Sequence, residues 1–584
     1  MSSATRPELL GTLGMVTSTH WLATAAGMAA LEAGGNAFDA AVATGLALHV
    51  VEPHLNGLGG DAPIIGASAG ETFVVSGQGT APAAASHGAF AALGLDLIPG
   101  TGHLAAVVPG AFGAWMTLLE RWGTLSLRDV MSAAIGYARD GYALIPQAAT
   151  TIAAVEQLFR EHWPTSAAVY LRSGVPAARA RFANPDLAHT LERLLAAGEA
   201  RGMSREAQID GARRAFYEGF VADAVQDFLR RPVRDSSGRD HAGLLTGADL
   251  AGWRAPVEEA VTAEVFGVTV AKTAAWGQGP VLLQQLLMLE TLGADNADPS
   301  SADLVHASLE VAKLAFADRE AYYGDVADVP IDRLLSRAYA AERAALVGAE
   351  ARDPLPGGTD WRLPRAPHAE APRTASVGTG EPTIDRSGRT RGDTCHLDAV
   401  DRWGNVVSAT PSGGWLQSSP VIPGLGFSLS TRGQMFWLEQ GLPNSLTPGR
   451  RPRTTLSPGI VLRDGRATLA FGTPGGDQQD QWTVPFLVRH LTGGQSLQDA
   501  IDAPTWHSTH VTSSFWPRDS EPLGAVVEGR VGREAIADLA ARGHRVTAAG
   551  GWSLGRLTAA GIRDDGMLRA AATSRGDQAY AAGR

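Results

Sequence analysis

Thr394 is the residue whose type and position in the sequence most directly suggest chemistry. It follows Asp393 at the end of a long polar stretch, and it opens a run of residues that is typical of a β-strand. A threonine at a free N-terminus carries a hydroxyl nucleophile and an α-amine on one residue. That amine has a pKa of about 7.7–8.0 and can act as the general base for the hydroxyl. Inside an intact chain the same nitrogen is an amide, so a cut between Asp393 and Thr394 would create the catalyst. The alternative is structural, because most threonines that open a strand do no chemistry.

Other kinds of site find less support in the sequence. There is no His-Glu-x-x-His motif, and the single cysteine, Cys395, allows neither an internal disulfide nor a paired Cys-x-x-Cys site. His507 and His510 come nearest to a ligand pair, but two loop histidines are more typical of an ordinary surface. The glycine-rich segments 56–61 and 472–477 lack phosphate-loop spacing and predict tight turns. We therefore expect no metal and no cofactor.

The bulk composition is that of an ordinary globular protein. The chain has 584 residues, of which 45% are hydrophobic and 19% charged, and this length suggests about two to four domains. The net charge is −11 and no basic run occurs, which argues against a nucleic-acid partner. The N-terminus lacks a signal-peptide pattern, and the most apolar helical stretch, 40–51, is too short to span a bilayer. We expect a cytoplasmic protein that does not enter a membrane.

The elements that must position Thr394 begin with a helix-rich zone, about residues 11–350. Residues 21–31 predict an alanine-rich helix that ends at Gly34-Gly35. Asn36 can cap the next helix, which runs to Val51 and is apolar on nearly all sides, so we expect it to be buried. Further helices are predicted at 129–140, 184–197 and 303–321, and strand-like runs at 72–76 and 261–271.

The next two zones meet at Thr394. Residues 352–393 are rich in Pro, Gly, Arg and Thr, lack apolar periodicity, and predict a loop or flexible tether. A cleavage site at its end would account for so long a stretch without regular structure. The zone after Thr394 is β-rich at first, and its predicted elements are strands at 395–400 and 406–410 around a turn at 401–405, a second hairpin at 461–469, and helices at 496–501 and 532–542.

A series of motifs in one order resembles the γ-glutamyltransferase family of N-terminal-nucleophile hydrolases over nearly the whole chain. The similar segments are 14–16, 34–43, 51–60, 80–83 and 108–110 before Thr394, and 394–396, 401–405, 433–435, 453–458 and 473–476 from there on. The resemblance implies a four-layer αββα sandwich of the α+β class. It also implies self-cleavage into a large subunit, 1–393, and a small subunit, 394–584, which build the fold jointly and stay associated. Whether such pairs dimerise is left open.

The resemblance also implies roles for single residues. Thr394 corresponds to the nucleophile, and Ser412 stands where the family has a second threonine whose hydroxyl supports the first. Gly475 and Gly476 correspond to the pair whose backbone N–H groups form the oxyanion hole. Small residues suit that role because the backbone must come close to the developing charge.

Two substrate-binding positions depart from the family. Gln78 stands where γ-glutamyl enzymes use an arginine to hold the α-carboxylate of the substrate, so a bidentate charge-assisted pair is lost. The family's Gln-Met pair is kept at Gln434, but Trp437 stands where the family has an aspartate for the α-ammonium. An aromatic wall thus replaces a counter-ion. Near Ser412, Gly414 replaces the family's asparagine.

Four further residues near the matched motifs are candidates for substrate binding. Thr454 and Thr455 replace a serine pair that helps to hold the substrate in the family, and the alternative for them is packing at a strand end. Arg432 and Arg453 are extra cations. Either could bind a substrate carboxylate, or form a structural salt bridge.

These departures favour an amidohydrolase that cleaves a small-molecule amide through an acyl-enzyme and does not act on a typical γ-glutamyl donor. An acyl group without an α-amine, with aromatic or apolar bulk, fits the altered residues better. The pattern resembles a branch that includes oxamate-amide hydrolases and glutaryl-type cephalosporin acylases. Two alternatives stay open: a γ-glutamyltransferase or glutathione hydrolase that binds its donor differently, and a non-catalytic member of the family.

Overall fold

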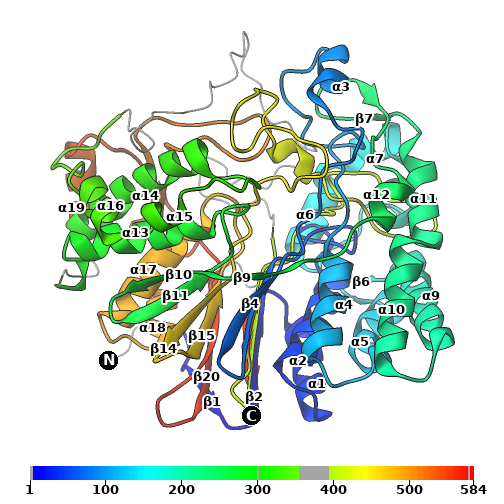
Figure 1. Ribbon diagram of the computed structural model, residues 1–584, viewed down its shortest axis with the longest axis horizontal. Coiled ribbons are helices and arrows are strands. Elements are labelled where there is room, and N and C mark those ends of the chain that lie inside the picture. Colours follow the sequence, from blue (N-terminus) through cyan, green and yellow to red (C-terminus); the bar gives the residue numbers. More distant parts are fainter. Residues whose placement is uncertain (1–3, 297, 299–300, 354–393, 576–578) are drawn as a thin grey trace.

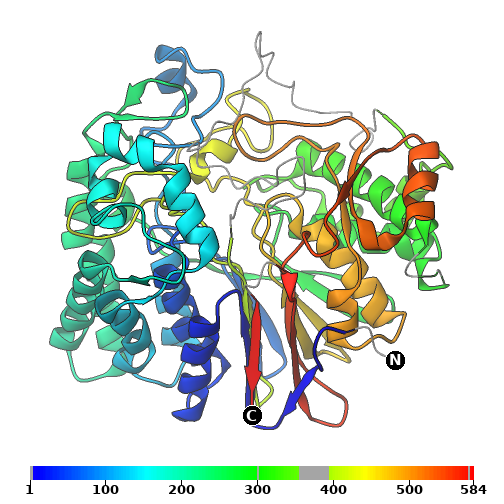
Figure 2. The ribbon, with the colours of Figure 1, turned by 180° about the vertical axis from the view of Figure 1, so that it is seen from behind.

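Two seven-stranded antiparallel sheets lie face to face at the centre of the molecule, and helices cover both outer sides (Figures 1 and 2). The computed structural model describes residues 4–296, 298, 301–353, 394–575 and 579–584. The predicted tether, apart from residues 352 and 353, and the predicted cleavage residue Asp393 lie outside the described residues. The four layers are those expected of an αββα sandwich.

The first sheet takes its strands from both sides of Thr394. Its order is β21 (Tyr580–Gly583), β2 (Gly14–Ser18), β12 (Leu397–Asp401), β13 (Val406–Ala409), β3 (Ile64–Ser68), β4 (Glu71–Val75) and β9 (Val257–Glu259). The predicted hairpin after Thr394, β12–β13, is therefore hydrogen-bonded between β2 and β3, which come from the first 70 residues. Neither part of the chain could form this sheet alone.

The second sheet also takes its strands from both sides of Thr394. Its order is β1 (Leu9–Gly11), β20 (Leu568–Ala572), β19 (Thr558–Ile562), β15 (Arg466–Gly472), β14 (Gly459–Arg463), β11 (Val268–Lys272) and β10 (Val261–Val265). The second predicted hairpin is confirmed as β14–β15, with a turn at Asp464 and Gly465. The strand-like run 261–271 is two strands, because the chain turns at Phe266 and Gly267, both with positive φ.

The helices on the outer side of the first sheet include α1 (Trp21–Glu32), α2 (Ala37–Val51), α4 (Ala111–Trp122) and α5 (Leu127–Asp140) (Figure 1). Those on the outer side of the second include α13 (Gly279–Thr291), α14 (Ala302–Tyr322), α17 (Gln479–Leu491) and α18 (Leu497–Asp502). Five of these eight helices, α1, α2, α5, α14 and α18, were predicted from the sequence, whereas α4, α13 and α17 were not. Asn36 caps α2 in a capping box with Asp39, and every residue of α2 is buried, as predicted. No helix of the described residues is long and apolar enough to cross a membrane.

The remaining elements surround this core. The helices are α3 (His87–Ala92), α6 (Pro146–Ala154), α7 (Glu156–Glu161), α8 (Pro164–Tyr170), α9 (Pro185–Arg201), α10 (Arg205–Tyr217), α11 (Phe220–Leu229), α12 (Gly247–Ala251), α15 (Ile331–Leu334), α16 (Arg337–Ala344) and α19 (Arg533–Ala541). The strands are β5 (Tyr142–Ala143), β6 (Arg181–Phe182), β7 (Val233–Arg234), β8 (Asp240–His241), β16 (Trp506–Ser508), β17 (Gly524–Glu528) and β18 (Arg545–Ala549).

Asp401 ties the β12–β13 hairpin to α2. Its carboxylate accepts hydrogen bonds from the backbone N–H of Trp403 (2.9 Å) and Asn405 (3.1 Å) and from the side-chain amide of Asn405 (2.8 Å). It also accepts one from the N–H of Ala37 (2.8 Å), the first residue of α2. One carboxylate thus fixes the turn and joins it to a helix more than 300 residues earlier in the chain.

Replacing Asp401 by alanine should destabilise the protein measurably. Several N–H groups would lose their acceptor, at a cost of about 2–4 kcal/mol in the free energy of unfolding, and thermal unfolding should show a Tm several degrees lower. Asp565→Ala is the matched control, because Asp565 is an exposed turn residue that accepts one backbone bond, from Met567 (3.1 Å). Equal Tm values for the two variants would contradict this role of Asp401.

Candidate active site

Thr394, Ser412 and Asp61 stand side by side at one end of the first sheet. Thr394 is paired with Ser412, and Ser412 with Asp61, through isolated antiparallel bridges that extend the register of β12, β13 and β3. The Thr394 hydroxyl oxygen lies 3.1 Å from the Ser412 hydroxyl oxygen, and both side chains are buried. The structure therefore brings together two of the residues that the sequence predicts to act together.

Asp61 is a member of this site that the sequence analysis did not identify. Its carboxylate accepts hydrogen bonds from the Ser430 hydroxyl (2.8 Å), from Nε of Arg432 (3.1 Å) and from the side-chain amide of Gln78 (3.4 Å). Burial raises the pKa of Asp61 to about 6, against the opposing effects of Arg432 and Ser430. The ion pair with Asp61 is the structural salt bridge that was one of the two alternatives for Arg432.

The glycine pair Gly413-Gly414 lets its loop approach the Asp61 loop closely. Gly413 and Gly414 have φ values of 72° and 67°, in the left-handed region that favours glycine. A Cβ at Gly413 would lie 2.6 Å from an oxygen of Asp61, and one at Gly414 would lie 3.0 Å from the backbone nitrogen of Gly60. This backbone therefore favours a glycine at 414, where the family has asparagine.

His396 joins the two sheets next to Thr394. Its Nδ1 is 2.9 Å from the Thr410 hydroxyl, and its Nε2 is 3.0 Å from the Asp398 carboxylate. The ring fills the space that a side chain at Gly472 would occupy. Because His396 precedes β12 and Gly472 ends β15, the segments that carry Thr394 and Gly475 leave the two sheets at the same end.

Gly475 and Gly476 lie between β15 and the start of α17. Gly475 has a φ of 130°, and a Cβ there would lie 2.5 Å from the ring of Trp482. The carbonyl of Gly476 accepts the N–H of Gln479, the first residue of α17. The pair thus precedes a helix N-terminus, which is a favourable place for negative charge.

The polar side chains predicted to hold substrate differ in whether their polar atoms already form hydrogen bonds within the protein. Thr454 pairs through its backbone N–H with Trp276 O (3.1 Å), and its hydroxyl accepts the N–H of Leu456 (3.3 Å). The hydroxyl of Thr455 and the side-chain carbonyl of Gln78 are buried and have no hydrogen-bond partner among the described residues. The described residues thus leave the hydrogen-bonding capacity of these two groups unused.

Trp437 and Arg453 are held by the same carboxylate, that of Glu320 on α14. The indole N–H of Trp437 donates to Glu320 (3.3 Å), and the guanidinium of Arg453 forms an ion pair with it. Burial alone would raise the pKa of Glu320, but Arg453, Arg319 and Arg518 lower it to about 2. Arg453 is therefore engaged in a structural ion pair, the second of the two alternatives that the sequence left for it.

The side-chain amide of Gln434 is also engaged within the protein. Its nitrogen donates to Gly100 O (3.1 Å), and its oxygen accepts the backbone N–H of Trp516 (3.1 Å). Gln434 thus connects three loops at this end of the molecule.

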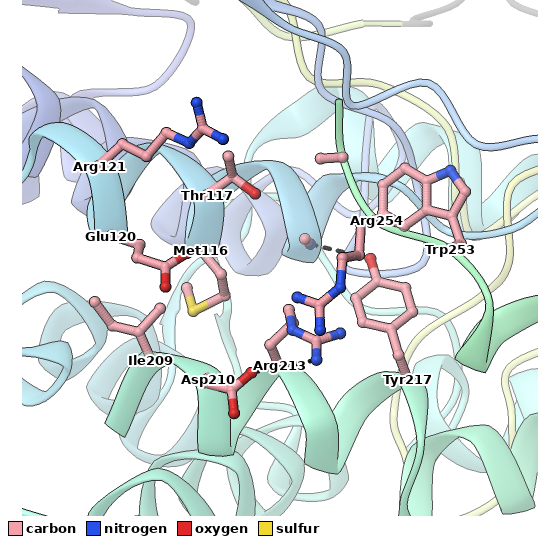
Figure 3. Close-up of a pocket in the computed structure, with 12 residues that line it drawn as sticks. Met116, Thr117, Glu120, Arg121, Ile209, Asp210, Arg213, Tyr217, Trp253 and Arg254 are labelled. Carbon is pink, nitrogen blue, oxygen red and sulfur yellow. Dashed lines mark hydrogen bonds and ion pairs between the residues drawn. The ribbon is translucent and has the colours of Figure 1, made fainter. Parts of the chain in front are cut away.

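A cavity of about 120 Å³ lies behind the site, between α4, α10 and residues 253–255 (Figure 3). None of the predicted site residues lines it. The hydroxyl of Tyr217, in its wall, donates to Pro109 O (2.7 Å) and accepts the N–H of Gly113 (3.0 Å). The N–H groups of residues 110 and 111 in turn donate to Gly60 O, next to Asp61 (2.8 and 2.9 Å). This wall supports the Asp61 loop from behind.

The profile of the family described as "Gamma-glutamyltranspeptidase" matches residues 23–583. The chain belongs to this family. It is 31% identical to the "Acylase ACY 1 proenzyme" of Pseudomonas sp. (strain SE83), covering 97% of this chain and 93% of the relative. It is 30% identical to the "Glutathione hydrolase-like YwrD proenzyme" of Bacillus subtilis, covering 98% and 99%. It is 30% identical to the "Oxamate amidohydrolase proenzyme" of Klebsiella pneumoniae subsp. pneumoniae, covering 98% and 99%.

Solved structures agree with this membership. The protein named LmbA2991HD is 52% identical, with a TM-score of 0.93 and full coverage of both chains. The cephalosporin acylase from Bacillus halodurans is 28% identical, with a TM-score of 0.82 over 99% of this chain and 97% of the acylase. The family resemblance and the expected fold are thereby confirmed.

The buried Asp61 carboxyl should make stability depend on pH. Its pKa rises from 3.8 to about 6 on folding, so the folded chain binds this proton more tightly than the unfolded chain. The resulting stabilisation is fully present below about pH 4 and is lost as the pH rises through 6. Asp61→Asn cannot titrate and should gain about 2–3 kcal/mol relative to its parent between pH 4 and 7.

This difference is measured by urea unfolding of both proteins. Both carry Thr394→Ala, so that two uncut chains are compared. Asp565→Asn, at an exposed position, controls for the general effect of acid. Stability curves of Asp61→Asn and its parent that stay parallel from pH 4 to 7 would show that Asp61 does not change its protonation there.

Proposed function

We propose that the chain is an autoprocessing amidohydrolase whose nucleophile is the N-terminal Thr394 of a small subunit, 394–584. The observation that carries this proposal is the buried pair of hydroxyls, Thr394 and Ser412, 3.1 Å apart where both sheets end. The relatives named above are proenzymes, which supports a maturation cut. The large subunit, 1–393, would remain bound, since both sheets contain strands from both parts.

Maturation is proposed to use the Thr394 hydroxyl before its amine exists. The oxygen attacks the carbonyl carbon of Asp393, the C–N bond of that peptide breaks, and an ester takes its place. Water then opens the ester, which leaves a carboxylate on Asp393 and a free α-amine on Thr394. The Ser412 hydroxyl, as the neighbour that can donate to or accept from the attacking oxygen, holds it in position.

The mature site is proposed to cleave an amide in two steps. The α-amine of Thr394 takes the hydroxyl proton as the oxygen attacks the substrate carbonyl, and that proton passes to the leaving amine. Backbone N–H groups of Gly475 and Gly476 stabilise the oxyanion, an interaction whose loss typically costs about 10²–10³ in rate. Water then hydrolyses the acyl-enzyme and restores Thr394.

The proposed substrate is a small-molecule amide whose acyl group lacks an α-amine. Gln78 offers a neutral hydrogen-bonding group where a carboxylate would call for a cation, and Thr455 offers a hydroxyl. Trp437 offers an apolar wall, which Glu320 and Arg518 hold from behind. We assign Gln434 and Arg453 to shaping these walls, since their polar groups are already bonded within the protein. Relatives named as acylases and as an oxamate amidohydrolase support this class of donor.

A γ-glutamyl-transferring or glutathione-hydrolysing enzyme is the second candidate. The relative named as glutathione hydrolase-like supports it. The indole of Trp437 weighs against it, because a buried α-ammonium would need a counter-ion, and the uncharged Gln78 weighs against it, because the α-carboxylate would need a cation.

Self-cleavage can be read from a denaturing gel. The wild-type chain should give two bands, with the N-terminal sequence Thr-Cys-His-Leu on the smaller one. Thr394→Ala should give one uncut band, because no nucleophile remains, whereas Thr394→Ser keeps a hydroxyl and should still cut, more slowly. A wild-type chain that stays whole would favour the alternative of a non-catalytic family member.

Substrate class can be tested with two anilides that differ by one amine. Glutaryl p-nitroanilide and γ-glutamyl p-nitroanilide share every other atom, and we expect kcat/KM to be about tenfold or more higher for the glutaryl compound, since burying an unpaired ammonium is costly. Thr394→Ala provides the blank. Faster release from the γ-glutamyl compound would refute the proposed donor class while leaving the nucleophile assignment intact.

A further inference from the structure

His306, Glu310 and His544 form a buried cluster that the proposed catalytic mechanism does not use. His306 and Glu310 are four residues apart on α14 and so share one face of that helix. His544 directly precedes β18, in the three-stranded sheet β16-β17-β18 that packs against α14. One nitrogen or oxygen atom from each of the three side chains lies within 4.8 Å of the others. All three are at least 95% buried.

The orientation of His306 is fixed by a bond outside the cluster. Its Nε2 lies 2.9 Å from Gly348 O. A carbonyl oxygen only accepts, so Nε2 carries the proton and Nδ1 carries the lone pair. That lone pair points at Nε2 of His544, 2.8 Å away. Metal-binding histidines are commonly oriented by such a bond from the other ring nitrogen to a backbone carbonyl.

Lys313 is the group that competes with a metal ion here. Its ammonium lies 2.5 Å from an oxygen of Glu310 and donates to Arg352 O (2.9 Å). The charge of Asp353 also acts on Lys313. Asp353 therefore offers Lys313 a second carboxylate partner when Glu310 binds an ion. Without an ion, the cluster is a ring-to-ring hydrogen bond beside a lysine–glutamate pair.

We propose that His306, Glu310 and His544 bind one zinc ion. The ligands are Nδ1 of His306, Nε2 of His544 and a carboxylate oxygen of Glu310, with water in the fourth position. Imidazole and carboxylate are ordinary zinc ligands, and bonds of about 2.0–2.1 Å in a tetrahedron separate two nitrogens by roughly 3.3 Å. The rings need to move apart by only about half an ångström for this. His544 carries its proton on Nδ1 when the ion is bound.

The ion would join residues on both sides of Thr394. His306 and Glu310 belong to the proposed large subunit and His544 to the small one, so zinc would clamp the two polypeptides together away from the catalytic residues. Binding itself does not rest on the proposed function, because the cluster exists in the uncut chain. The sequence gives no motif for it, since 238 positions separate the two histidines.

His507 and His510, the pair noted in the sequence, do not face one another as ligands. His507 accepts the indole N–H of Trp482 (3.2 Å), and His510 accepts the backbone N–H of Leu523 (3.0 Å). His510 instead approaches Asp353, 3.9 Å away, at the edge of the new cluster.

The test is zinc content and zinc-dependent stability of the full chain. Protein freed of metal with a chelator is titrated with zinc by calorimetry, and bound metal is counted by mass spectrometry after gel filtration. We expect one zinc per chain and a higher Tm with zinc, reversed by chelator and not produced by magnesium. His544→Gln and the nearly isosteric Glu310→Gln should each weaken binding about 10-fold or more, while His490→Gln, a histidine on α17 outside the cluster, should bind as the wild type does.

Two results would overturn the proposal. One is a wild-type chain that retains no zinc and shows no zinc-dependent change in Tm. The other is equal zinc binding by the wild type and Glu310→Gln. Circular dichroism and self-cleavage at Thr394 show whether each variant is folded, so a loss of zinc cannot be mistaken for a loss of structure. A chain that binds zinc but lacks catalytic activity would refute the proposed function and not the zinc site.

Discussion

The backbone register at the end of the first sheet is the constraint on which the site depends. Thr394 reaches Ser412 because β12 pairs with β13, and Ser412 reaches Asp61 because β13 pairs with β3. A slip of one residue would turn each side chain to the opposite face. The positions of the two hydroxyl-bearing residues are thus set by the main-chain pairing of the strands.

Buried ion pairs then determine which side chains surround the proposed nucleophile. On one side Asp61 is paired with Arg432, and on the other Glu320 is paired with Arg453 and Arg319. Removing one partner of such a pair leaves the other charge unpaired in the interior, which is strongly destabilising. Under the proposed function, these charges are held within the protein, and the groups left to meet a substrate would be neutral ones such as Gln78.

Local signals in the sequence were sufficient for much of the fold. The cap at Asn36 and the turn at 401–405 are read from a few neighbouring residues, and both are present in the structure. Asp61 could not be recognised in this way, since its importance arises only when β3 lies beside β13. Helix α17 was not predicted, and it carries a proline, Pro485, in its interior. The partner of Arg453 lies 133 positions away, beyond the reach of any local pattern.

The position of β12 and β13 between β2 and β3 sets an order of events. Those strands cannot take their places unless the earlier part of the chain is already there to pair with them. The peptide bond before Thr394 would therefore come under attack only in molecules that have completed both sheets. The proposed cut would then occur only in correctly folded chains, and a misfolded chain would stay in one piece and without activity.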